Sequence, residues 1–299
     1  MIARKYLYLI ALAKEKHFGR AATACHVSTS TLSAAIRDLE TELGVAVVER
    51  GQHFTGLTPE GLRVLDYAQR MAASAEALRQ DLASRQGGLS GQLRLGVIPT
   101  ALPRVAELTA SFARRHPQTT MLIHSMATPD ILHHLRNFEL DGGIVYSETG
   151  EDSDFFFQPM WVEGHVLISG SEKFAGRTAI TWAEAADLPL ALLTPDMQNR
   201  KIIDKVFAEL GRPVKPKLES NSLFGMLAQI CAGPWSGIVP RAVLDLIDAP
   251  EGIRVLDLQE PSVAWATGLI TPARDPLGPM VAALREEARS LHALSGKDE

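Results

Sequence analysis

Small hydroxyl side chains and one arginine are concentrated in a short stretch of the sequence, where they could hydrogen-bond to a nucleic acid. These residues are Thr29, Ser30, Thr31, Ser33 and Arg37. A hydroxyl can bond to base edges or to phosphates, and an arginine can bond to guanine or to phosphate. Serine and threonine also favour the first turn of any helix, because their hydroxyls satisfy free backbone N–H groups. An ordinary solvated helix start therefore remains the alternative.

Apolar spacing predicts two short helices that position these side chains. Apolar residues recur at helical intervals in two runs, which are Phe18, Ala22 and Cys25, then Leu32, Ile36, Leu39 and Leu43. Each run makes one apolar helix face. Residues 25–28 between them allow only a tight turn, and Ser28 is the expected N-cap of the second helix. Two such helices form a helix-turn-helix, whose second helix places its N-terminal residues in the major groove of DNA.

A hairpin is expected directly after these helices. Residues 45–50 and 55–58 have the pattern of two strands, and residues 51–54 form the turn. Such a wing would carry Arg50 and His53 near its tip, where they could reach a phosphate or the minor groove; a hairpin that only caps the helices is the alternative. Arg20 and Ser28 of the helices complete the expected DNA-contacting set with the residues named above.

This region resembles the LysR-type transcriptional regulators. The resemblance rests on residues 17–22, 25–28, 32–33, 36–40, 42–45, 49–50 and 57–61. It implies an α/β chain with an N-terminal winged helix-turn-helix, a long linker helix and a two-lobed effector domain like a type II periplasmic binding protein. The sequence departs from the family at Thr29, where glutamine is frequent, and at Ala34 and Ala35, where a larger polar pair is frequent. A preference for particular bases therefore does not carry over from relatives.

A long helix is expected over residues 59–85. Pro59 suits the first turn, and Thr58 can cap it. Apolar residues then alternate at intervals of four and three, namely Val64, Ala68, Met71, Ala75, Leu78 and Leu82. This heptad stripe predicts pairing with a second copy of the helix, although a helix lying on its own chain is the alternative. The resemblance implies a homodimer, often a homotetramer, and a dimer would read an inverted-repeat operator in double-stranded DNA.

Domain boundaries follow from composition and from the resemblance. We expect a DNA-binding domain over 1–58, the linker helix over 59–85, a glycine-containing hinge over 86–91 and an effector domain over 92–299. Short apolar runs alternate with helical patterns after the hinge, which predicts α/β units with mostly parallel sheets. Lobe I would comprise 92–161 and 268–299, and lobe II 162–267. The chain would cross between the lobes near 158–163 and 264–269, and a terminal helix would cover 276–294.

Three strand-to-helix junctions in the effector domain predict a ligand site. They contribute Pro99 and Thr100, then Thr128 and Pro129, then Gln198 and Asn199. Helix N-termini offer free N–H groups and a positive dipole end, so their convergence favours a small anion such as a carboxylate. A simple capping role for Thr100 stays open. Residues 197–204 also resemble regulators found beside formate dehydrogenase genes, which makes formate a candidate effector.

Composition limits the remaining classes of protein. The chain has 299 residues, a formal net charge of −5 and two cysteines, and it has no apolar run long enough to cross a membrane. The N-terminus does not resemble a signal peptide, so we expect a cytoplasmic protein without disulfides. Residues 1–58 hold seven Lys or Arg and five Asp or Glu, whereas residues 90–299 hold 19 and 26. This imbalance favours nucleic-acid binding by the N-terminal part.

Three other functions are weighed against a regulator. An enzyme is disfavoured because the sequence has no nucleophile elbow, no phosphate-binding loop and no metal-ligand spacing; the adjacent His133 and His134 are a poor metal pair. We expect no metal and no cofactor. A free-standing small-molecule carrier would leave the N-terminal region without a role. A thiol redox sensor is suggested by peroxide-sensing members of the family, but the effector domain has only Cys231, which we expect to be buried in an apolar helix.

Overall fold

The computed structural model describes residues 2–49, 54–149, 153–245, 252–273 and 277–295. Arg50 and His53, which we expect near the tip of the wing, both lie outside these ranges. The chain divides into two compact units, Met1–Leu89 with Leu277–Pro279 and Ser90–Pro276 with Met280–Glu299. We call them the N-terminal and the C-terminal unit. No helix within the described ranges has the length and apolar character to cross a membrane.

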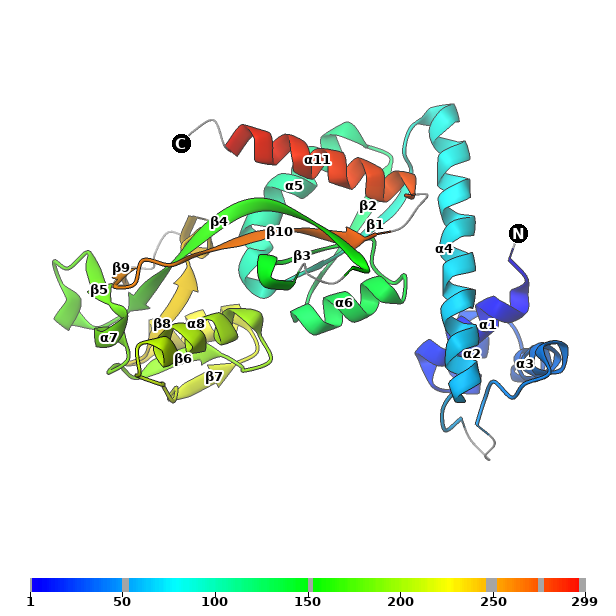
Figure 1. Cartoon of the computed structure of the whole chain (residues 1–299), viewed down its shortest axis with the longest axis horizontal. Coiled ribbons are helices and arrows are strands. Elements are labelled where there is room, and N and C mark those ends of the chain that lie inside the picture. Colours follow the sequence, from blue (N-terminus) through cyan, green and yellow to red (C-terminus); the bar gives the residue numbers. More distant parts are fainter. Residues whose placement is uncertain (1, 50–53, 150–152, 246–251, 274–276, 296–299) are drawn as a thin grey trace. The chain divides into compact units, whose positions relative to one another are not determined.

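The N-terminal unit is helical (Figure 1). Its helices are α1 (Arg4–Glu15), α2 (Phe18–Ala24), α3 (Thr29–Leu43) and α4 (Pro59–Gly87). The apolar faces of α1, α2 and α3 meet in one core, and the buried residues of α3 are Leu32, Ile36 and Leu39. The turn between α2 and α3 is closed by a hydrogen bond from the Val27 N–H to the Ala22 carbonyl, 3.0 Å long. The predicted helix-turn-helix is confirmed.

The two segments of the expected hairpin pair in the described residues, and residues 50–53 lie outside them. Val48 and Leu57 form an isolated antiparallel bridge, and the Glu49 N–H donates to the Gly56 carbonyl at 3.1 Å. The carboxylate of Glu40 on α3 accepts the N–H groups of Val47 and Val48 at 2.7 and 3.0 Å. The Thr58 N–H also donates to the Val47 carbonyl at 3.1 Å, so residues 47–49 pair with residues 56–58, and Glu40 ties this pair to α3.

Helix α4 begins as the sequence predicts. The Thr58 hydroxyl accepts the Gly61 N–H at 2.9 Å, which confirms it as the cap. Of the expected heptad stripe, Ala68 is fully buried and Val64 packs partly against the core of the same unit. Farther along, α4 exposes large apolar side chains on one side, namely Tyr67, Met71, Leu78 and Leu82. We call these four residues the α4 stripe. The first third of the expected seam is thus used inside the unit; of the rest, Met71, Leu78 and Leu82 are exposed and Ala75 is half-buried.

The C-terminal unit has two α/β lobes. Its strands are β1 (Gly91–Val97), β2 (Thr119–Ser125), β3 (Gly142–Tyr146), β4 (Phe155–Ser169), β5 (Ala179–Thr181), β6 (Leu190–Leu193), β7 (Leu218–Ser220), β8 (Ser236–Pro240), β9 (Arg254–Gln259) and β10 (Ala264–Pro272). Its helices are η1 (Pro99–Ala101), α5 (Leu102–Arg115), α6 (Thr128–Arg136), η2 (Ser147–Thr149), η3 (Glu172–Phe174), α7 (Trp182–Ala185), α8 (Gln198–Glu209), α9 (Leu223–Ala232), α10 (Ala242–Asp245) and α11 (Pro279–Ser295).

Two long strands connect the lobes. The strand order is β2-β1-β3-β10-β4-β8-β6-β7, and β9 pairs with β4 and β5. Figure 1 shows β4 and β10 running side by side through both lobes, as their antiparallel register requires. Pairing is parallel within the lobes around β1 and β6, but β4 and β10 are antiparallel to each other and to β8, β9 and β3. The expectation of mostly parallel sheets is therefore wrong for these strands, because the chain passes between the lobes once in each direction.

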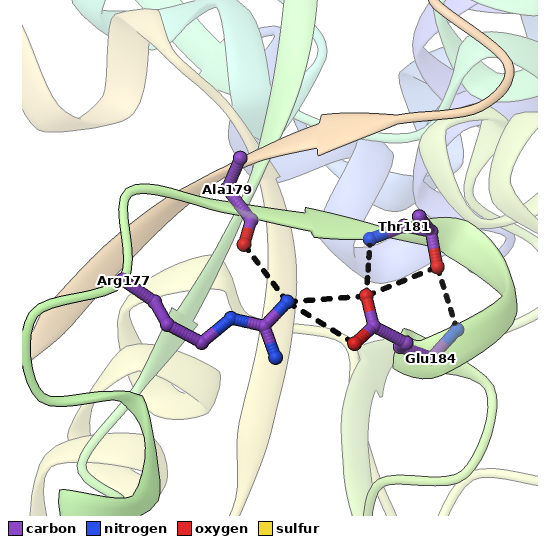
Figure 2. A network of polar contacts seen from close by, with 4 residues as sticks. All are labelled: Arg177, Ala179, Thr181 and Glu184. Carbon is purple, nitrogen blue, oxygen red and sulfur yellow. Dashed lines mark hydrogen bonds and ion pairs between the residues drawn. The ribbon is translucent and has the colours of Figure 1, made fainter.

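A polar network fixes the start of α7 in lobe II (Figure 2). The Glu184 carboxylate accepts the Thr181 N–H at 2.9 Å, and the Thr181 hydroxyl accepts the Glu184 N–H at 3.1 Å, which together make a capping box. Arg177 donates to the same carboxylate and to the Ala179 carbonyl, both at 3.1 Å. The backbone hydrogen bond from Thr181 and the bond from Arg177 lower the pKa of Glu184. These groups satisfy one another, so we assign the cluster a structural role.

Candidate functional site

The first turn of α3 presents hydroxyl groups at the surface of the N-terminal unit. The Ser28 hydroxyl accepts the Thr31 N–H at 3.1 Å, which confirms Ser28 as the N-cap. The same oxygen lies 2.8 Å from the hydroxyls of both Ser30 and Thr31. Thr29, Ser30 and Thr31 are exposed. Ser28 therefore organises its neighbours, and the exposed hydroxyls beyond it retain hydrogen-bonding capacity.

The cations expected beside this turn differ in their surroundings. Arg37 on α3 is exposed and forms no ion pair within the part of the chain that the structure describes. Arg20, in contrast, donates to the backbone carbonyl of Glu15 at the end of α1 and lies 3.6 Å from its carboxylate. Ser33 is half-buried. Arg37 is thus the more available cation for a phosphate or a base.

The C-terminal unit contains a small cavity between the two lobes. Its lining residues are Ile98, Pro99, Thr100, Ala127, Thr128, Leu193, Met197, Gln198 and Asn199. Its enclosed volume is about 10 Å³, which is about the space that one water molecule needs. The cavity as it stands therefore admits only a very small group, and a larger ligand requires its walls to move. We call it the interlobe cavity.

Two helices begin at the interlobe cavity without a side-chain cap. Neither Ala127 before α6 nor Met197 before α8 makes a capping hydrogen bond with its side chain. Thr128 is 5% exposed, and its hydroxyl has no hydrogen-bond partner among the described residues. Leaving a buried hydroxyl unpaired is unfavourable. Pro129 has no N–H and the Asp130 N–H donates to the Ala127 carbonyl at 3.1 Å. The groups suited to a polar ligand are therefore the hydroxyl and N–H of Thr128 and the first N–H groups of α8.

Behind the cavity, a buried polar chain joins the lobes. The Thr100 hydroxyl lies 3.3 Å from the Tyr146 hydroxyl, to which the Asn199 amide nitrogen donates at 3.4 Å. The same nitrogen lies 2.8 Å from Nε2 of His165. Thr100 therefore bonds to Tyr146 and does not cap a helix, so the capping role that the sequence left open for this residue is excluded.

Burial sets the ionisation of this chain. Desolvation lowers the pKa of His165 to about 3, so its imidazole is neutral near pH 7. Desolvation and then the negative charge of Glu163 raise the pKa of Tyr146 to about 12. The Tyr146 phenol therefore keeps its proton. The groups behind the interlobe cavity supply hydrogen bonds but no positive charge.

Most of the residues expected to bind an effector line this cavity. Pro99, Thr100, Thr128, Gln198 and Asn199 do so, and the Gln198 amide also donates weakly to Glu148 at 3.4 Å. Pro129 is exposed and does not belong to the lining. Pro129 follows Thr128 in the first turn of α6, and it is Thr128 that faces the cavity.

Arg200, which follows Asn199 on α8, does not supply a cation to the interlobe cavity. Its guanidinium donates to the Leu193 carbonyl at 2.9 Å and to Glu219 and Asp204 at 2.6 and 2.8 Å. These bonds anchor the start of α8 to β6 and β7. The cavity lining as described contains no Lys, Arg or Asp.

Tyr146 and His165 were missed by sequence analysis. Tyr146 ends the apolar strand β3, and His165 lies within the largely apolar second half of β4. A lone polar residue in a buried strand indicates a hydrogen-bond partner elsewhere in the fold, since buried polar groups need one. The partner, Asn199, lies 34 residues away from His165 in sequence, which no local pattern reveals.

The cysteines differ from expectation. Cys231 on α9 is exposed, so the prediction of a buried structural thiol is wrong; the exposed side of this apolar helix includes Phe224, which is 79% exposed. Cys25 is half-buried, and burial raises the pKa of its thiol. His133 and His134 bond to Asn137 and Glu139, and no cluster of metal-ligating side chains occurs within the described ranges.

Comparison with known proteins identifies both units. Residues 3–62 match the model of bacterial regulatory helix-turn-helix proteins of the lysR family, and residues 86–293 match the LysR substrate binding domain. The chain is 29% identical over 293 residues to the DNA-binding transcriptional dual regulator OxyR of Escherichia coli, covering 97% of this chain and 95% of that protein.

Solved structures agree on the architecture. A full-length OxyR variant from Pseudomonas aeruginosa superposes with a TM-score of 0.77 at 27% identity and covers 97% of this chain and 95% of its own. The regulator CbnR in complex with its target DNA gives a TM-score of 0.70 at 21% identity, covering 97% and 100% of the two chains, which supports the fold.

These matches decide between the classes weighed from the sequence. The helix-turn-helix and the substrate-binding domain occur together, in the order that the sequence predicts. A free-standing carrier does not account for the first of them, and the family consists of transcription regulators, which are not enzymes. The chain belongs to the LysR family of transcriptional regulators.

Proposed function

We propose that this regulator binds operator DNA through the exposed face of α3 and responds to a small molecule, sensed either at the Cys231 thiol or in the interlobe cavity. The observation that carries the DNA-binding role is the exposed group of hydroxyls on the first turn of α3, with Arg37 two turns farther on. The first turn of a recognition helix meets base edges in the major groove. The hydroxyls of Thr29, Ser30 and Thr31 are therefore our candidates for base contacts, and Arg37 for a phosphate.

The operator is proposed to be an inverted repeat read by a dimer or a tetramer. The α4 stripe supports this, because four large apolar side chains on one helix face favour a partner surface. A two-fold pair of heads would contact half-sites about 34–36 Å apart, or a multiple of that spacing. Footprinting of the DNA upstream of the regulator's own gene tests this proposal, and a single asymmetric half-site would contradict it.

Replacing Arg37 by alanine should weaken binding to every DNA sequence. If the guanidinium neutralises one phosphate, the slope of log affinity against log salt concentration should fall by about 1. Fluorescence anisotropy over a salt series measures both quantities. Arg79→Ala is the control, because Arg79 is also exposed, on α4, but is paired with Glu76. An unchanged salt slope together with lost discrimination at one base pair would make Arg37 a base reader instead.

Peroxide is our first candidate for the signal. Relatives named hydrogen peroxide-inducible genes activators support it, including one from Pectobacterium carotovorum that is 29% identical and matches 93% of this chain. They favour a redox signal over the carboxylate that the sequence analysis placed first. The exposed Cys231 thiol could take one oxygen atom from hydrogen peroxide, giving a sulfenic acid and water as the O–O bond breaks.

The cysteine count limits how such a signal could act. The sequence has only Cys25 and Cys231, and Cys231 alone belongs to the C-terminal unit. A disulfide within one effector domain is therefore not available. Oxidation of Cys231 would have to act as a sulfenic acid, as a mixed disulfide, or through a second subunit.

A small anion such as formate is the second candidate. The uncapped starts of α6 and α8 and the unpaired Thr128 hydroxyl favour it, since helix N-termini attract anions. The missing cation in the lining weakens it. The two candidates involve different groups, so they can be separated by mutation.

Footprints recorded with hydrogen peroxide and with sodium formate should separate the two signals. If peroxide acts on the thiol, Cys231→Ser should abolish the change that peroxide causes in the footprint, and Cys25→Ser should preserve it. If formate acts in the cavity, Thr128→Val should abolish its effect and leave the peroxide effect intact. A peroxide effect that survives in Cys231→Ser would contradict thiol oxidation at this residue, and two inactive compounds would contradict both candidates.

A further inference from the structure

The orientation of one buried amide decides what the interlobe cavity offers to a ligand. Asn199 is 4% exposed, and its amide nitrogen faces Nε2 of His165 at 2.8 Å and the Tyr146 hydroxyl at 3.4 Å. A primary amide nitrogen has two hydrogens. Both are directed into this polar chain, so the group that Asn199 has left for the cavity is its carbonyl oxygen.

His165 maintains this orientation. Its Nε2 accepts the amide hydrogen only while the imidazole is neutral and carries its proton on Nδ1, a buried atom with no hydrogen-bond partner among the described residues. The ring is 5% exposed and lies edge-on to Trp265, with 4.9 Å between the ring centroids. Burial lowers the pKa of His165 to about 3, which keeps the ring neutral. A protonated ring would instead force the amide to turn its oxygen inward.

The charges around the cavity disfavour an anion. No cationic side chain occurs in the cavity lining, and Arg200 is committed to Asp204 and Glu219. The buried Glu163 is close enough to Tyr146 to raise its pKa. Two helix N-termini contribute only partial positive charges. A carboxylate would lose its hydration without meeting a full positive charge, and one of its oxygens would face the carbonyl of Asn199.

We propose that His165 and Tyr146 position Asn199 so that the interlobe cavity selects a small uncharged ligand that both donates and accepts hydrogen bonds. The Asn199 oxygen would accept a hydrogen from the ligand, and the unpaired Thr128 hydroxyl would donate to it. This inference rests on the proposed ligand-binding role of the cavity. It ranks an uncharged signal above a carboxylate of the same shape.

Acetamide and acetate provide the matched probes, because they have the same number of heavy atoms and nearly the same shape. Titration of the full-length protein, followed by NMR shifts of amides at the starts of α6 and α8, gives both dissociation constants without DNA. We expect acetamide to bind at least tenfold more tightly than acetate, which corresponds to about 1.4 kcal/mol. Equal or tighter binding of acetate, or no shift with saturating acetamide, would overturn the proposal.

Variants test the positioning role separately from folding. His165→Phe keeps a buried ring but removes the acceptor, so the acetamide-to-acetate preference should fall toward one. His165→Gln restores an acceptor and should restore the preference, and Tyr146→Phe should reduce it even if His165→Phe does not fold. His116→Phe is the control, because His116 lies beside Phe112 and is absent from the lining. A preference that is unchanged in both His165→Phe and Tyr146→Phe would contradict the positioning role.

Failure of this inference is distinguishable from failure of the proposed function. DNA binding by the wild-type protein and its response to peroxide or formate are read from footprints. The ligand preference is read from the isolated protein. A regulator that responds on DNA but binds acetate more tightly would retain its function and lose only the inferred role of His165.

Discussion

Replacing both Leu78 and Leu82 by glutamate should make the protein monomeric and lower its operator affinity at least about a hundredfold. The two side chains are 60% and 55% exposed on α4 and lie on the same face as Tyr67 and Met71. Pairing of two such faces would bury all four, and buried charge without a partner is strongly unfavourable. Loss of pairing removes the gain in affinity that arises when two heads bind linked half-sites.

Sedimentation velocity and electrophoretic mobility shift on the same operator fragment measure the two effects. Leu62→Glu is a matched control, since Leu62 is 58% exposed on the same helix but lies on the opposite side. It should change neither property. A Leu78→Glu, Leu82→Glu variant that remains dimeric would show that another surface holds the subunits together.

Acid should destabilise the C-terminal unit through His165. Its pKa falls from 6.5 to about 3 on burial. Between these pH values the imidazole is protonated in the unfolded chain and neutral in the folded chain. Stability from this neutral ring is therefore complete above pH 6.5, decreases as the pH falls, and reaches its minimum near pH 3. The slope from one such group is at most about 1.4 kcal/mol per pH unit.

Urea unfolding at several pH values between 7.5 and 4 checks this expectation, with about half a unit between points to define the slope. His165→Gln should flatten the dependence in this range, because glutamine does not titrate. His124→Gln, at an exposed position on β2, should leave it unchanged. An identical acid sensitivity in the His165→Gln protein would show that other groups govern it.

Local sequence patterns predicted the N-terminal unit well because its elements depend on near neighbours. Ser28 caps α3 through a residue three positions later, and Thr58 caps α4 in the same way. Leu32, Ile36 and Leu39 form one helix face whatever they pack against. Residues 47–49 pair with residues 56–58 as the hairpin pattern predicted. The bonds from the Val47 and Val48 N–H groups to Glu40 were not predicted, because β-propensity contains no information about a side chain on a neighbouring helix.

The effector site was predicted only in outline. Helix starts are visible in the sequence, so Thr100, Thr128 and Asn199 could be named. Their partners were not visible, because Tyr146 and His165 approach Asn199 from strands far away in the chain. Arg200 shows the same limit: it follows Asn199 directly in sequence, but its charge is paired with Glu219 on β7 and does not reach the cavity lining. Exposure of Cys231 also depends on which face of an apolar helix the fold covers.

The passage of β10 back through both lobes has a consequence for biosynthesis. The sheet of lobe I receives β10 and the covering helix α11 only after all of lobe II has been translated. While the ribosome completes lobe II, β3 has no partner on its β10 side and the apolar face that α11 covers is open to water. Nascent chains of this regulator should therefore depend on chaperones until late in synthesis, and a stop codon just before Ala264 should yield a degraded fragment instead of a constitutive regulator.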